Sequence, residues 1–111
     1  MNNKKYLGKN VEVIIDRPID SHHLKYDYVY EVNYGYIANT KAPDGEEIDA
    51  YVLGIDKPLD NFTGKCVAIV HRTNDNDDKL IVVPEGISFS DEEIEKLIEF
   101  QEKWFKHVIL R

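Results

Sequence analysis

Residues 65–83, KCVAIVHRTNDNDDKLIVV, contain two short runs rich in Val and Ile, residues 65–71 and 80–83, on either side of a polar stretch. Runs of this kind bounded by polar turn residues are typical of β-strands. Three more segments share this character and extend the pattern outward along the chain, at residues 11–15, 25–37 and 48–55. The sequence therefore predicts about five short strands, which would form a small curved β-sheet or a barrel.

Residues 25–37, KYDYVYEVNYGYI, carry tyrosine at alternate positions, which is the spacing that places side chains on one face of a strand. We expect a strand here with Tyr26, Tyr28 and Tyr30 on the same face. The Asn-Tyr-Gly sequence at residues 33–35 predicts a turn directly after that strand.

The C-terminal part of the chain changes to helical periodicity. Ser90 is a candidate N-cap, and Glu93 three residues later completes a capping box. Apolar side chains then recur at helical spacing and predict one amphipathic helix, with the stripe Ile94, Leu97, Ile98, Phe105 and Val108. The fold class is therefore mainly β with a C-terminal α-helix that closes a small curved β-sheet or barrel, with residues 1–111 in one domain.

The composition of the chain excludes some classes of binding partner. The chain of 111 residues has a formal net charge of −7. This charge argues against binding of nucleic acid, which depends on basic side chains that neutralise its phosphates. A barrel that stacks single-stranded nucleic acid on its 7 tyrosines is the alternative, but it would lack a basic groove. Cys66 is the only cysteine, and no segment is apolar enough to span a membrane. We expect a cytoplasmic protein with neither nucleic acid nor membrane as a partner.

Two acidic clusters stand out. Residues 44–49, DGEEID, hold four carboxylates, which repel one another unless a cation lies among them. Residues 75–79, DNDDK, form a second cluster with Lys79 beside it. Taken alone, each cluster is more simply interpreted as a solvated polar turn than as a metal site. Together, two carboxylate loops and a lysine suit a site for Mg²⁺ and phosphate.

The combination of motifs resembles the family I soluble inorganic pyrophosphatases over nearly the whole chain. DGEEIDA at residues 44–50 is similar to that family's three-acid metal signature, and YEVNYGYI at residues 30–37 is similar to the segment that precedes it. IIDRP and LKYD upstream, DNDDKLIVVP downstream and Phe105-Lys106 near the end match further family segments. The resemblance implies a small five-stranded OB-like β-barrel, a reduced form of the pyrophosphatase fold.

The resemblance implies hydrolysis of diphosphate to two phosphates, by a hydroxide held between Mg²⁺ ions, with Mn²⁺ as the alternative metal. It implies that Glu46 orients or deprotonates the water and that Asp49 bridges two ions. The implied metal ligands are Asp44, Asp49, Asp77, Asp75 and Asp16. The implied phosphate-binding residues are Lys25, Tyr34, Lys79 and Lys106.

The chain also departs from the family pattern. The family's long hairpin, which carries a phosphate-binding arginine, is almost absent between Asp27 and Tyr30, and Glu46 stands where the family has Asp. Phe105 replaces a tyrosine. The alternatives are a hydrolase of another phosphoanhydride, or a degenerate homologue that binds metal and phosphate without turnover. So short a chain would also gain stability by forming a homo-oligomer.

Overall fold

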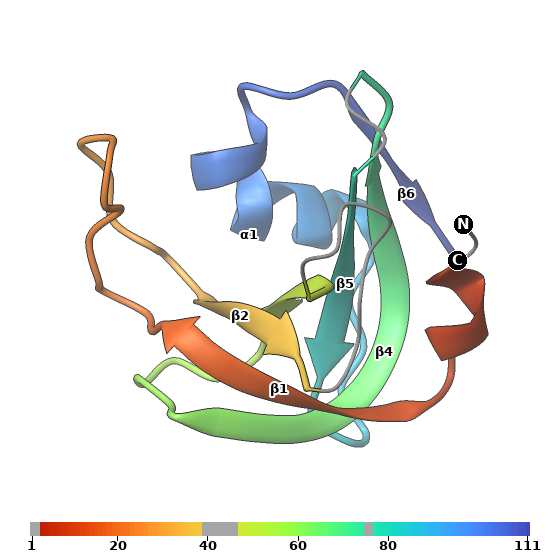
Figure 1. Ribbon diagram of the computed structural model, residues 1–111. Helices are drawn as coiled ribbons and strands as arrows, with labels where there is room; N and C mark the ends of the chain where they lie inside the picture. The colour runs from red at the N-terminus through yellow and green to blue at the C-terminus, as the bar shows by residue number, and fades with distance from the viewer. Residues whose placement is uncertain (1–2, 39–46, 75–76) are drawn as a thin grey trace.

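The structure, a computed structural model, describes residues 3–38, 47–74 and 77–111 (Figure 1). A short 3-10 helix precedes six strands and one α-helix in these residues. In chain order they are η1 (Asn3–Tyr6), β1 (Asn10–Arg17), β2 (Asn33–Ile37), β3 (Asp49–Val52), β4 (Asn61–Arg72), β5 (Asp77–Val83), α1 (Asp91–Glu102) and β6 (His107–Leu110).

Five of the strands close into a barrel. They pair in the order β1-β2-β3-β5-β4, and β4 pairs again with β1. The long, curved β4 makes this closure, because its first residues pair with β1 while residues 65–72 pair with β5 (Figure 1). The β3–β5 pairing is parallel and the other pairings are antiparallel, and β6 adds to the end of β4. The predicted five-stranded barrel with a helix is confirmed.

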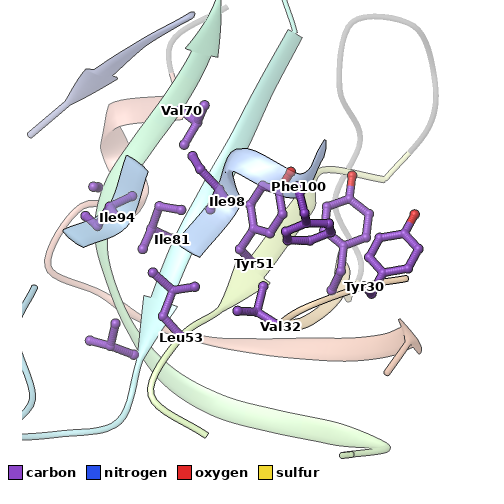
Figure 2. Close-up of a cluster of buried hydrophobic side chains, with 12 residues drawn as sticks. Tyr30, Val32, Tyr51, Leu53, Val70, Ile81, Ile94, Ile98 and Phe100 are labelled. Atoms are coloured by element: carbon purple, nitrogen blue, oxygen red, sulfur yellow. The ribbon is translucent and has the colours of Figure 1, made fainter. Parts of the chain in front are cut away.

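Side-chain alternation divides the apolar residues into two cores. One set of alternate residues fills the barrel interior, including Val13, Ala50 and Leu80. The residues between them face outward and pack under α1, where Ile81 and Tyr51 meet Ile98 (Figure 2). Figure 2 shows aliphatic side chains at one end of this second core and the rings of Tyr51, Phe100 and Tyr30 at the other. The helix therefore covers one part of the outer barrel wall.

The helix begins as expected. The Ser90 side chain accepts a hydrogen bond from the Glu93 backbone N–H, and the Glu93 carboxylate accepts one from the Ser90 N–H, which is the predicted capping box. The helix ends at Glu102, so the prediction that its stripe continues through Phe105 and Val108 was wrong. Residues 107–110 instead form β6, because the end of β4 offers an open edge to pair with.

The prediction of a strand over residues 25–32 was also wrong. Outside the named strands, this segment has one isolated bridge, His22 with Val29, and its tyrosine rings pack against one another and against the end of α1. Residues 33–35 are strand rather than turn. The side chain of Asn33 is buried and accepts hydrogen bonds from the Ile19 and Leu59 backbone N–H groups, so it ties loops together.

No helix among the described residues is both long and apolar enough to cross a membrane.

Gly35 is fixed by the close approach of two strands. A Cβ at this position would collide with the backbone carbonyl of Ile14 on β1. We expect Gly35→Ala to lower the free energy of unfolding by about 3 kcal/mol, because a backbone clash inside a closed barrel cannot relax without breaking pairing. Urea unfolding measures this change.

Gly86→Ala is the comparison variant. Gly86 has open space around it but a left-handed φ of 81°, so this change should cost only about 1 kcal/mol. Equal losses for the two variants would contradict the steric explanation for Gly35.

Candidate active site

The candidate site lies on the outer wall of the barrel beyond the end of α1. Because side chains alternate along a strand, the outward positions of neighbouring strands form one stripe across the wall. This stripe contains one or more polar side chains from each of the five barrel strands: Asp16, Tyr34, Asp49, Arg72, Asp77 and Lys79. The segments that carry them are far apart in sequence, and barrel closure brings them together.

Lys79 is at the centre of the stripe. Its Nζ donates to Asp49 Oδ2 at 2.7 Å and to Asp77 Oδ2 at 2.6 Å. The parallel β3–β5 register sets Asp49 directly beside Lys79. The ammonium is almost fully buried, whereas the two carboxylates remain about one-third exposed. The carboxylates therefore keep oxygen atoms open to a ligand while Lys79 balances part of their charge.

Tyr34 and Asp16 flank Asp49. Burial first, and then the negative charge and hydrogen bond of Asp49, raise the pKa of Tyr34 well above its usual value. Tyr34 therefore stays a neutral hydroxyl donor. Partial burial likewise raises the pKa of Asp16, against the nearby charge of Arg17, and the charges of Asp49 and Glu47 add to the rise. This part of the wall is an electronegative centre in which an added cation would be stabilised.

Two neighbouring cavities open on this wall. The first has a volume of ≈ 500 Å³, and its lining includes Asp16, Lys25, Tyr34 and Asp49. The second has a volume of ≈ 480 Å³, and its lining includes Tyr34, Arg72 and Lys79. Tyr34 lines both cavities, so the two are adjacent. Carboxylates and cations thus meet on one continuous concave surface.

A buried ion pair supports the wall behind Lys79. Arg72 at the end of β4 binds Glu102 at the end of α1 through two hydrogen bonds, Nε to Oε1 at 2.9 Å and Nη2 to Oε2 at 2.7 Å. Tyr51 donates to Glu102 Oε2 at 2.5 Å, and Gln101 Nε2 donates to the Tyr51 hydroxyl at 2.8 Å. The guanidinium also lies 3.7 Å from the ring centre of Phe105.

Both members of this pair stay ionised. Burial alone would lower the pKa of Arg72, but the hydrogen bonds and charge of Glu102 outweigh it and raise the pKa. Burial would raise the pKa of Glu102, but hydrogen bonds from Arg72 and Tyr51 lower it. The charged side chain of Arg72 is therefore held rigidly at the cavity wall.

The other predicted site residues are distributed as follows. Lys25 is exposed and lines the cavity that contains Asp16 and Asp49. Lys106 is exposed and lines neither of the two cavities. Three predicted site residues lie outside the described residues, namely Asp44, Glu46 and Asp75.

Sequence reasoning missed the group formed by Arg72, Glu102, Tyr51 and Gln101. Gln101 and Glu102 occupy consecutive positions at the end of α1, and the structure buries both. Helical periodicity gave no reason to single them out. Their role depends on contact between α1, β3 and β4, which are far apart in sequence.

The chemistry of the stripe fits a hard divalent cation. Asp16, Asp49 and Asp77 offer only oxygen donors, which Mg²⁺ prefers over the nitrogen and sulfur donors typical of zinc sites. Within residues 3–38, 47–74 and 77–111, no group of three or more His, Cys, Asp or Glu side chains is close enough to share one metal ion. A full ligand set would therefore need residues beyond these ranges, or water.

Fold and site together define a small β-barrel protein with a carboxylate and ammonium centre on its wall. Comparison with known proteins identifies the family of this barrel. The family model described as inorganic pyrophosphatase matches residues 2–109. The chain belongs to the inorganic pyrophosphatase family, whose members are hydrolases of diphosphate.

An inorganic pyrophosphatase of Xylella fastidiosa is 29% identical over 127 aligned residues, covering 92% of this chain and 70% of that protein. The inorganic pyrophosphatase structure from Ehrlichia chaffeensis has a TM-score of 0.72 at 20% identity, covering 91% of this chain and 84% of the other. The Helicobacter pylori enzyme structure has a TM-score of 0.69 at 19% identity, covering 92% and 84%. These structural likenesses support the fold.

The Arg72–Glu102 pair generates a stability prediction. We expect Glu102→Gln to lower the free energy of unfolding by about 3 kcal/mol, because it removes the charged partner that accepts two hydrogen bonds from the buried guanidinium and leaves the more distant Asp77, at 3.8 Å. Arg72→Met in the same background should then cost far less than it does alone, with a coupling energy of about 1–3 kcal/mol. A double-mutant cycle by urea unfolding measures the coupling, and strictly additive losses would contradict it.

The same pair predicts a pH dependence. Because the pKa of Glu102 is lower in the folded state than its usual 4.5, its contribution to stability is complete above that value. The contribution is lost as pH falls through the folded pKa. Thermal unfolding should therefore show a steeper loss of stability below about pH 4.5 in the parent protein than in Glu102→Gln. Parallel curves for the two proteins would show that Glu102 is not the titrating group.

Proposed function

We propose that the protein hydrolyses inorganic diphosphate to two phosphates in the presence of Mg²⁺. The observation that carries this proposal is the ammonium of Lys79 held between Asp49 and Asp77 on the wall of a cavity. Carboxylates and a fixed lysine side by side are the groups needed to bind a divalent cation and a phosphate together. Membership of the pyrophosphatase family supports the same reaction.

The proposed roles follow from the chemistry of each group. Lys79, Lys25 and Lys106 would bind phosphate oxygens as compact cations. Tyr34 would donate its hydroxyl, since its raised pKa keeps the proton in place. Glu46 would orient the attacking water or accept its proton.

Asp49, Asp77 and Asp16, together with Asp44 and Asp75, would hold the metal. When bound, Mg²⁺ supplies charge neutralisation for the phosphates and acidifies a water molecule. The carboxylates of Asp49 and Asp77, each about one-third exposed, support this assignment, because their oxygens are still accessible. Mn²⁺ has the same ligand preferences and is the alternative metal.

We also propose that residues 1–111 form one domain and that it acts in the cytoplasm. Cys66 is a free, buried thiol and the chain's single cysteine, so the chain forms no internal disulfide, which is consistent with a reducing compartment. We also propose that several copies assemble, because exposed apolar side chains such as Leu24 and Val108 remain on the surface.

Phosphate release from diphosphate in Mg²⁺ tests the function. We expect activity that a chelator abolishes and that metal restores. Asp49→Asn should weaken metal affinity by about 100-fold or more, because it removes a ligand charge while keeping the shape of the side chain. Metal titrations of the initial rate measure this loss.

Asp56→Asn is the matched control, since it makes the same chemical change at an exposed position between β3 and β4. It should retain the parent rate. A parent protein that binds diphosphate with metal but releases no phosphate would identify a degenerate binding homologue and refute the proposed activity.

A further inference from the structure

The cavity beside Lys79 is larger than diphosphate needs, and most of its wall is aromatic. Its volume of ≈ 480 Å³ falls in the range of about 300–1,000 Å³ that binds drug-sized organic ligands. Arg72 and Lys79 supply cations on the wall. Besides Tyr34, six more rings line the cavity, from His23, Tyr26, Tyr28, Tyr30, Trp104 and Phe105. Inorganic diphosphate consists only of phosphorus and oxygen, so it has no group that would bind these rings.

The rings come from two segments that the fold brings together. Residues 18–32, the orange segment of Figure 1, project beside the end of α1. Tyr28 connects the two segments, because its hydroxyl donates to Gln101 Oε1 at 2.8 Å and its ring lies 5.3 Å from that of Trp104. The Lys25 and Tyr26 backbone N–H groups donate to His23 Nδ1, which fixes this loop.

Two of these aromatic side chains are more than half exposed to solvent. Tyr26 is 64% exposed and Trp104 is 56% exposed, although both line the cavity. Exposed aromatic faces at a cavity that also contains cations are typical of sites that stack a planar base and bind its attached phosphates. Arg72 and Lys79 are each paired with carboxylates, so the phosphates of such a ligand would be bound together with a Mg²⁺ ion at Asp49 and Asp77, while the neutral rings would hold its base.

We propose that this aromatic part of the cavity binds the base of a nucleoside di- or triphosphate whose terminal phosphoanhydride lies at Lys79, Asp49 and Asp77. The inference rests on the proposed hydrolytic function and names a second substrate class for that site. The oxygen of water bonds to the terminal phosphorus while the bridging P–O bond breaks. The bridging oxygen leaves on the shortened nucleotide, inorganic phosphate is released, and a carboxylate accepts the proton of the water.

Substrate comparison is the first test. Phosphate release is measured from ADP and ATP, with inorganic diphosphate and inorganic triphosphate as substrates that lack a base. We expect ADP or ATP to be hydrolysed. Trp104→Ala and Tyr26→Ala should each lower the ratio of kcat/KM for ADP to that for diphosphate by about 10-fold, the size of one stacking contact.

Two further variants make this test specific. Trp104→Phe keeps a ring and should restore most of the ratio. Ile87→Ala removes an apolar side chain that is 43% exposed and does not line this cavity, and it should leave the ratio unchanged. An equal loss for both substrates in Trp104→Ala would show a structural role and overturn the inference.

Binding gives a readout that does not need turnover. Trp104 is the only tryptophan, so its fluorescence reports on this cavity alone. We expect AMP to quench it saturably without metal, while ribose 5-phosphate and inorganic phosphate do not. Absence of quenching by AMP would overturn the inference.

The outcomes also separate the inference from the proposed function. Hydrolysis of diphosphate without hydrolysis of ADP or ATP would overturn the inference and leave the proposed function standing. Hydrolysis of ADP without hydrolysis of diphosphate would support the inference and refute diphosphate as substrate. A dimer that Trp104→Ala dissociates in size-exclusion chromatography, with no effect on ADP, would show that a second copy covers these rings and would overturn the inference.

Discussion

The parallel pairing of β3 with β5 is the constraint on which the candidate site depends. It sets Asp49 beside Lys79 and, with the pairing of β5 to β4, brings Arg72 level with Asp77. Parallel neighbouring strands need a long connection between them. Here the chain runs from β3 through the long strand β4 and returns in β5, which lies between β3 and β4. The polar stripe therefore exists only when the barrel is closed.

The ion pair of Arg72 and Glu102 extends this arrangement to the helix. It joins the end of β4 to the end of α1 and takes in Tyr51 of β3 through the shared carboxylate. Both charged side chains have low exposure, and burying two charges is costly. The cost is offset because the two hydrogen bonds between them have good geometry. The result is a rigid ion pair next to aromatic residues, rather than an ordinary apolar helix contact.

The shortened segment between β1 and β2 gives the site its own character. Where the pyrophosphatases that this chain resembles have a long hairpin, residues 18–32 form a compact loop of stacked rings, in which His23 lies 4.7 Å from Tyr28. These rings pack against the end of α1 instead of extending the sheet. These rings form most of the wall of the cavity beside Lys79.

The sequence by itself determined the strand cores at β1, β3, β4 and β5, the capping box at Ser90 and the acid-rich motifs, because these depend on neighbours within a few residues. It could not determine the end of α1 or the strand β6, since helical spacing at Phe105 and Val108 persisted where pairing with β4 took over. It also misassigned the tyrosine segment, whose rings pack on distant residues. The placement of Lys79 between two carboxylates and the pairing of Arg72 with Glu102 were decided only by the tertiary structure, because each contact joins residues that barrel closure and helix docking bring together.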